Sequence, residues 1–176
     1  MAEQKILKLG NPNLRKEALE YPPDWIGSDS FEKLLLDMRE TLRASGGIGL
    51  AAPQINILYR VVVIDIVNPN TRYGTIELSP FEVYINPKIY ILEKETEGFW
   101  EGCLSVPGMM GYVERPKKIR IDYLNRKGEP KSKVAQGFLS TVFQHEFDHL
   151  DGILYVDRIS DPKLFSFEDE YKEFHV

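Results

Sequence analysis

The 176-residue sequence predicts an α+β fold, with antiparallel strands in small sheets packed around a central metal-binding helix that carries an HExxH motif. Three observations predict this class. Short β-branched or alternating segments recur between residues 59 and 135, an amphipathic helical pattern precedes them, and a second helical pattern follows them. The second helix contains the sequence His145-Glu146-Phe147-Asp148-His149, in which two histidines are spaced i and i+4.

The composition is that of an ordinary globular chain, with 43% hydrophobic and 28% charged residues. We expect residues 1–176 to form one catalytic domain with an acidic C-terminal tail at about 161–176. The net charge of -5 and the lack of a basic stripe argue against a nucleic-acid-binding patch. The single cysteine rules out an internal disulfide and fits a reducing compartment. No apolar run is long enough to span a membrane and no signal peptide is evident, so a cytoplasmic location is expected.

The N-terminal part is expected to begin with an extended lead-in over 5–15 and to continue into one helix. Asp29 is the expected N-cap, and the helix should run to about Ala44 and end at Gly46-Gly47. Its apolar residues recur at helical spacing, at Phe31, Leu34, Leu35, Met38 and Leu42.

Small residues dominate the next segment, 47–54, which reads GIGLAAPQ. Its glycines follow a helix rather than a strand and no Gly-Lys-Ser/Thr follows, which excludes a dinucleotide or phosphate loop. The segment is expected to be a tight loop whose backbone passes close to another group.

The rest of the chain alternates strand and turn patterns. Strands are expected at 59–66, at 81–92 as two strands interrupted at Asn86-Pro87, at 119–123, at 131–135 after a hairpin turn at 126–129, and at 153–156 as a short edge strand. Residues 67–80 are expected to form a loop, and 165–176 a short helix or a frayed tail.

The two histidines of the second helix lie one turn apart, so both can bind one metal ion from the same face. Glu146, beside the first histidine, is placed to act as a general base on a metal-bound water. A solvated helix with two incidental histidines is the competing interpretation. It is disfavoured because an apolar stripe leads up to the motif, at Phe138, Leu139, Val142 and Phe143.

A hydrolytic metal site needs three protein ligands and an open position. The only other histidine is His175, next to the C-terminus, which makes Cys103 the best candidate because Gly102 allows close backbone approach. A carboxylate from the acidic tail is the alternative third ligand, as in thermolysin-like zinc endopeptidases, and the candidates are Glu168, Asp169 and Glu170.

Three segments together resemble the motifs of the peptide deformylase family: GIGLAAPQ at 47–54, EGCLS at 101–105 and QHEFDH at 144–149. Their order and spacing are similar to the family's, and the resemblance extends from residue 5 to about 160. It implies a bacterial-type enzyme that removes the formyl group from the N-terminal formyl-methionine of newly made proteins and releases formate. The implied partners are N-formyl-methionyl nascent peptides, with transient ribosome contact.

The resemblance also implies the roles of individual residues. The expected metal is one Fe²⁺ ion per chain, held by Cys103, His145 and His149, and Zn²⁺, Ni²⁺ or Co²⁺ can occupy such a site in purified protein. Glu146 would transfer protons, while the Gln54 side-chain amide and the Leu104 backbone N–H would bind the substrate carbonyl oxygen.

The peptide would bind as an added strand through backbone groups near Ile48, Gly49 and Gly102. Its methionine side chain needs an apolar cavity, for which the expected lining is Ile48, Phe99, Phe138 and Val142. The family pattern further predicts an ion pair between Glu101 and Arg115.

Three features depart from the family's pattern. Met110 occupies a position where many members have a substrate-contacting Arg, the tail is acidic where some members have a basic ribosome-docking helix, and 67–82 is longer than in compact members. Two other functions stay open: a zinc endopeptidase, and a non-catalytic metal-stabilised peptide-binding module. Glu146 argues against the module, because a structural metal site needs no general base.

Overall fold

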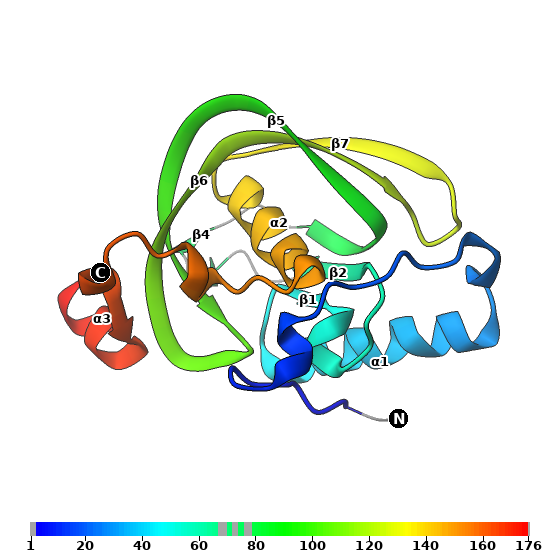
Figure 1. The fold of residues 1–176 in the computed structure, drawn as a ribbon, viewed down its shortest axis with the longest axis horizontal. Coiled ribbons are helices and arrows are strands. Elements are labelled where there is room, and N and C mark those ends of the chain that lie inside the picture. The colour runs from blue at the N-terminus through cyan, green and yellow to red at the C-terminus, as the bar shows by residue number, and fades with distance from the viewer. Residues whose placement is uncertain (1–2, 67–69, 72–73, 76–78, 176) are drawn as a thin grey trace.

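The computed structural model describes residues 3–66, 70–71, 74–75 and 79–175. Among these residues, six strands form one antiparallel sheet in the order β1-β2-β5-β6-β7, with β8 pairing to β6. The long strands arch over helix α2, while helix α1 lies below β1 and β2 in the view of Figure 1. The α+β class predicted from the sequence is confirmed, although one large sheet replaces most of the small ones expected.

Helix α1 covers Asp29–Ser45 and packs its apolar face against the sheet. The Ser28 hydroxyl accepts a hydrogen bond from the Phe31 N–H at 3.2 Å, so the N-cap lies one residue before the predicted Asp29. The helix ends at Gly46 in the left-handed conformation (φ 68°), where the sequence predicted its end.

Strands β1 (Gly49–Ala51) and β2 (Val61–Ile66) pair antiparallel. Every β2 side chain is buried, because alternate residues face α1 on one side and α2 on the other. The prediction of a tight loop at 47–54 is wrong for residues 49–51, which form β1, because small residues can also form ladder hydrogen bonds. A 3-10 turn at Ala52–Ile55 follows.

Strands β5 (Ser79–Cys103), β6 (Val106–Leu124) and β7 (Pro130–Gln136) form the arch. The prediction of two strands at 81–92 is wrong, because β5 continues past Asn86. That residue adopts φ 50° at a register shift, and its side-chain amide pairs with both backbone groups of Tyr21 at 2.7 and 2.9 Å. The backbone of Tyr21 therefore supplies hydrogen bonds where the ladder between β5 and β6 is interrupted.

Helix α2 (Phe138–Asp148) lies at the centre of the molecule, beneath the arch (Figure 1). Its inner face packs into a core contributed by several strands. Phe143 and Phe147 of the helix lie in this core with Ile64, Tyr84, Ile119 and Ile121 of the strands. This packing holds the C-terminal end of α2 in a fixed position relative to β5 and β6.

The C-terminal part differs most from expectation. A 3-10 turn, η5, occupies Tyr155–Arg158 where an edge strand was predicted. It is followed by β8 (Phe165–Phe167), which pairs with β6, and by helix α3 (Glu168–Phe174). A short helix was one of the two forms expected for this tail. The N-terminal lead-in also contains a 3-10 turn, at Pro12–Arg15, rather than being extended throughout.

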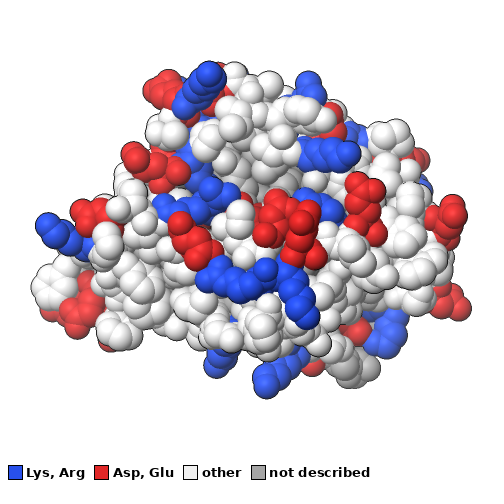
Figure 2. Space-filling view, in the orientation of Figure 1, with Lys and Arg blue, Asp and Glu red and all other residues white. Residues whose placement is uncertain are grey.

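The loop expected at 67–80 lies partly outside the described residues. Within the described part, β3 (Asn70–Thr71) pairs with β4 (Gly74–Thr75). No helix in the described ranges has the length and apolar character needed to cross a membrane. On the face shown in Figure 2, acidic and basic side chains are intermixed.

Candidate active site

Three potential metal ligands converge at the C-terminal end of α2. Cys103 ends β5, His145 lies in the last turn of α2, and His149 follows that helix as the first residue of the 3-10 turn η4 (His149–Asp151). One ligand atom from each lies within 4.8 Å of the others, and Cys103 Sγ is 3.3 Å from His149 Nε2. The structure therefore brings together the three residues singled out from the sequence.

The tail carboxylates do not join this group in the described part of the chain. Glu168, Asp169 and Glu170 belong to α3, which contacts β6 and β8. Rings from α3 and its C-cap, Tyr171 and His175, pack on Trp100 with centroid distances of 4.9 and 4.8 Å. The endopeptidase alternative, which needs a tail ligand, is therefore not favoured.

The surroundings of the histidines fit a divalent transition metal. The His145 Nδ1–H donates to Glu101 Oε2 at 2.7 Å, an arrangement that leaves Nε2 free to face Cys103 and is usual for metal-binding histidines. One thiolate and two imidazoles form a donor set suited to zinc, iron or cobalt. The buried Glu146 Oε2 has no hydrogen-bond partner among the described residues, as expected if it faces a metal-bound water.

Burial controls the charge of the two carboxylates nearest the ligands. Desolvation raises the pKa of Glu146 to about 7. Desolvation would raise the pKa of Glu101 as well, but hydrogen bonds from His145 and Arg115 outweigh it and lower that pKa. Glu101 therefore stays ionised, whereas Glu146 can exchange a proton near neutral pH.

The ion pair predicted between Glu101 and Arg115 is present and buried. Arg115 Nε donates to Glu101 Oε1 at 2.6 Å, and Nη2 donates to Oε2 at 3.0 Å. Its remaining nitrogen, Nη1, donates to Asp148 Oδ2 at 2.8 Å. Sequence reasoning missed Asp148, although it lies inside the HExxH segment.

The Gln54 amide is held in one orientation beside Cys103. Its Oε1 accepts from the Ala51 N–H at 2.9 Å, so its Nε2 must point the other way. That nitrogen donates to Ser105 Oγ at 3.1 Å and lies 3.7 Å from Cys103 Sγ. Leu104 lies in the turn between β5 and β6, next to Cys103. Ser105 was given no role from the sequence, although it is the last residue of the EGCLS segment.

An apolar pocket opens beside the ligands. It includes three of the four side chains expected to line a methionine cavity, and its lining residues are Ile48, Glu101, Gly102, Phe138, Thr141, Val142, His145 and Glu146. The fourth expected residue, Phe99, is not in this set. Its ring packs edge-on against Phe138, with centroids 5.2 Å apart. Thr141 is an additional lining residue that the sequence did not suggest.

Gly49 of β1 lies directly against Glu146. A Cβ at position 49 would be only 2.5 Å from Glu146 Oε1, which is too close for any side chain. Glycine at this position therefore allows the carboxylate to occupy its place between β1 and the metal ligands.

Met110 is 1% exposed and lies between two other strands. It pairs with Gly102 of β5 and with Ser166 of β8. The residue found in place of the family's Arg is therefore an interior residue of the sheet.

The sequence matches known proteins over nearly its whole length. The model of the polypeptide deformylase family matches residues 3–165. A peptide deformylase from Leptospira biflexa is 47% identical over 171 residues, which cover 97% of this chain and 95% of the relative. Peptide deformylase 2 from Pseudomonas syringae pv. tomato is 42% identical over 166 residues, covering 94% and 92%.

Solved structures agree in fold. A class I type b peptide deformylase from Acinetobacter baumannii bound to Met-Ala-Ser gives a TM-score of 0.86 at 36% identity, covering 90% of this chain and 99% of that one. Peptide deformylase from Thermotoga maritima gives 0.78 at 38% identity, covering 92% and 100%. The ligand triad, the three sequence segments and these likenesses lead to one conclusion: the chain belongs to the peptide deformylase family of metal-dependent hydrolases.

Proposed function

We propose that residues 1–176 act as one catalytic domain that removes the formyl group from N-terminal formyl-methionine and releases formate. The observation that carries this proposal is the convergence of Cys103, His145 and His149 next to the buried Glu146. A structural metal site would be closed by a fourth protein ligand, whereas three ligands beside a carboxylate suit hydrolysis. The membership of the family supports the same activity.

We infer that Fe²⁺ is the native metal and that Cys103, His145 and His149 hold it. When bound there, a divalent ion would lower the pKa of a coordinated water and polarise the substrate carbonyl. Metal analysis of protein prepared without oxygen tests the identity of the ion. Replacement by Zn²⁺, Ni²⁺ or Co²⁺ during purification is expected, because ligands of this type do not select iron by affinity.

The acid–base role is assigned to Glu146. With its pKa raised to about 7 by burial, this carboxylate can accept a proton from the attacking water and later give it to the departing amine. The Gln54 Nε2–H and the Leu104 N–H are proposed to stabilise the negative charge that develops on the formyl oxygen. The fixed orientation of the Gln54 amide, set by Ala51 and Ser105, supports its part in this role.

The substrate backbone is proposed to extend the sheet at β1, using groups near Ile48, Gly49 and Gly102. The Acinetobacter relative bound to Met-Ala-Ser supports a peptide ligand with an N-terminal methionine. The methionine side chain would enter the pocket between Ile48, Phe138 and Val142, while Phe99 packs edge-on against Phe138.

This pocket assignment is tested by filling the pocket. Val142→Trp should raise KM for formyl-methionyl peptides by tenfold or more, because the indole would occupy the space of the methionine side chain. The variant should still bind metal. An unchanged KM would show that the side chain lies elsewhere.

The expected partners are N-formyl-methionyl nascent peptides in the cytoplasm. Any transient ribosome contact would use a surface other than α3, since Glu168, Asp169 and Glu170 would repel ribosomal RNA phosphates.

Formate release from formyl-Met-Ala-Ser is the direct test of the proposed activity. The metal-loaded protein should release formate and leave the peptide bonds intact, and Cys103→Ala should abolish both turnover and tight metal binding. Cleavage of internal peptide bonds, with metal binding retained in Cys103→Ala, would instead support the endopeptidase.

A further inference from the structure

We propose that the turn η5 positions the metal ligand His145 through two of its residues, Tyr155 and Arg158. The proposal concerns the metal site and rests on the proposed function for its catalytic consequence. Neither side chain is one of the three potential ligands. Each instead contacts a group that fixes the orientation of the His145 ring.

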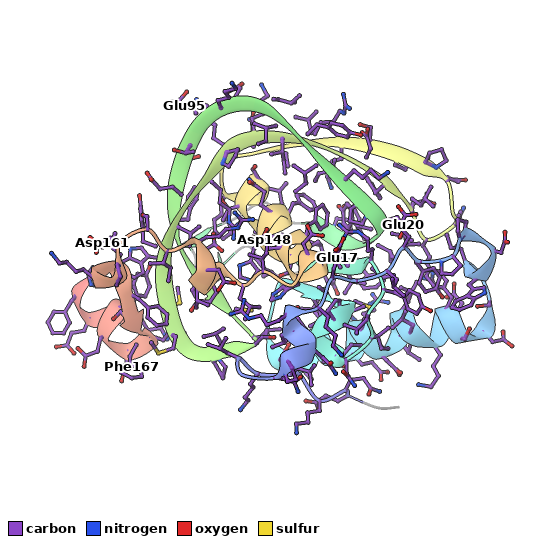
Figure 3. All side chains as sticks on the ribbon, viewed as in Figure 1. Glu17, Glu20, Glu95, Asp148, Asp161 and Phe167 are labelled. Carbon is purple, nitrogen blue, oxygen red and sulfur yellow. The ribbon has the colours of Figure 1, made fainter. Side chains whose placement is uncertain are left out.

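Arg158 reaches His145 through a continuous series of hydrogen bonds. Two of its guanidinium nitrogens donate to the two carboxylate oxygens of Asp148, which lies at the C-terminal end of α2 (Figure 3). Asp148 accepts from Arg115, which donates twice to Glu101, and Glu101 accepts from the His145 Nδ1–H. The series thus begins at a partly exposed residue and ends on a metal ligand.

The charges in this series explain why Arg158 is needed. Two buried carboxylates, Glu101 and Asp148, share the single buried guanidinium of Arg115. Without Arg158, Asp148 would keep only one hydrogen bond from Arg115, and it would compete with Glu101 for that cation. With Arg158 present, each carboxylate has a bidentate arginine partner. Glu101 can then keep its geometry toward His145.

Tyr155 restrains the same imidazole from its flat side. The two rings are nearly parallel, at an interplanar angle of 20° and a centroid distance of 5.9 Å. Tyr155 is buried, and its hydroxyl donates to the Met109 carbonyl of β6 at 3.2 Å. The His145 ring is therefore restrained on its face by Tyr155 and at Nδ1 by Glu101, which leaves Nε2 for the metal.

One turn of 3-10 helix presents both side chains together. Residues i and i+3 lie on the same side of such a helix, which applies to 155 and 158. Asp157 fixes the turn, because its Oδ2 accepts from the Leu154 N–H at 2.8 Å and its carboxylate pairs with Arg15. The N-terminal segment thereby helps to hold η5 in place.

The test measures metal retention and ligand geometry in addition to turnover. Cobalt-loaded wild type, Arg158→Gln and Arg158→Lys would be compared by visible absorption, by the rate of Co²⁺ loss to a chelator, and by kcat and KM for formyl-Met-Ala-Ser. Arg126→Gln is the matched control, since it removes an arginine that pairs with Glu32 on the surface, away from this series. Circular dichroism verifies that each variant is folded.

We expect Arg158→Gln to lose Co²⁺ up to about 10 times faster than wild type, the lower end of the effect on affinity for groups bonded directly to a ligand histidine, because Arg158 acts through Asp148, Arg115 and Glu101. Its cobalt spectrum should shift and its kcat should fall, while KM stays within about twofold because Arg158 does not line the substrate pocket. Arg158→Lys should recover part of the loss, since it restores the charge but not the bidentate geometry. Arg126→Gln should match wild type.

A second pair of variants examines the ring contact. Tyr155→Phe keeps the stacked ring and should retain Co²⁺ nearly as well as wild type, whereas Tyr155→Leu should lose it several-fold faster. Equal cobalt spectra and loss rates for wild type, Arg158→Gln and Tyr155→Leu would overturn the proposal. If wild type released no formate while Arg158→Gln still lost cobalt faster, the positioning role would stand and the proposed function would fail.

Discussion

Glu146 shows at the residue scale how an ordinary side chain acquires a special chemical role. It is buried, it faces Gly49, and its Oε2 has no hydrogen-bond partner among the described residues. These surroundings raise its pKa to about 7, into the range where a carboxylate can both take and give a proton.

Replacement of this carboxylate should remove proton transfer but not metal binding. Glu146→Gln should lower kcat by roughly 100- to 10,000-fold, the range typical of a lost general base. Its metal content should equal that of wild type, because Glu146 is not one of the three ligands. Steady-state kinetics with metal analysis checks both, and a variant retaining more than a tenth of wild-type kcat would contradict the assignment.

Gly49 makes room for the same carboxylate. In Gly49→Ala the new methyl would lie 2.5 Å from Glu146 Oε1, so the carboxylate must move. We expect kcat to fall by tenfold or more, since small displacements of a catalytic group are costly. Adding Gly49→Ala to Glu146→Gln should change the residual rate much less than in wild type. Equal losses in both backgrounds would show that Gly49 acts on something else.

The raised pKa of Glu146 also predicts a pH effect on the stability of the metal-free protein. The neutral acid is favoured in the fold, so its stabilising contribution is fully present below the unfolded pKa of 4.5 and is lost as pH rises toward 7. Between pH 4.5 and 7, the unfolding free energy of wild type should therefore fall by up to about 3 kcal/mol relative to that of Glu146→Gln. Urea unfolding of both proteins at several pH values measures the difference. A constant difference would contradict the prediction.

At the scale of elements, residue periodicity correctly predicted the elements whose ends and buried face are determined by nearby residues. The predicted ends of helix α1 were correct to within a residue or two, because its caps and its apolar spacing are local features of the sequence. Strand β5 was divided by mistake at Asn86, since the partner that compensates the irregularity, Tyr21, is far away in sequence. The turn η5 was mistaken for a strand for the same reason: its fixed shape depends on Arg15 and β6.

Helix α3 offers a prediction at this scale. Its Tyr171 and the following His175 cover Trp100, and an aromatic pair typically contributes about 0.5–1.5 kcal/mol. Deletion of residues 168–176 should therefore lower the unfolding free energy by about 1–3 kcal/mol. Metal content and kcat should be unchanged, because α3 contributes no ligand and lies outside the matched family region. Loss of metal from the truncated protein would contradict this view.

At the scale of the whole molecule, the sequence predicted those site residues whose role follows from the type of side chain alone. Cysteine, histidine and the three motifs indicated the ligand triad, the glutamate and the Glu101–Arg115 pair. Asp148 and Ser105 lie inside these motifs but were given no role, and Tyr155 and Arg158 lie outside them. Each is a common residue whose importance depends on a neighbour supplied by another element, such as β6 or α2.

The metal should stabilise the whole fold, because its ligands come from β5, α2 and η4. At a free metal concentration 100 times Kd, the gain should be about 2.7 kcal/mol, or a rise in Tm of roughly 5–10 °C. Calorimetry with and without metal measures it, and Cys103→Ala should show little of the rise. An equal rise in both proteins would mean that the ion binds elsewhere.

The separation of Cys103 from His149 by 46 positions has a consequence for biosynthesis. An ion bound to both would close a ring that contains β6, β7 and α2, because β5 ends at Cys103 and precedes the ring. A partly translated chain cannot form that ring until its second imidazole has left the ribosomal tunnel. Binding of the ion by all three ligands therefore falls after β5, β6, β7 and α2 have been synthesised.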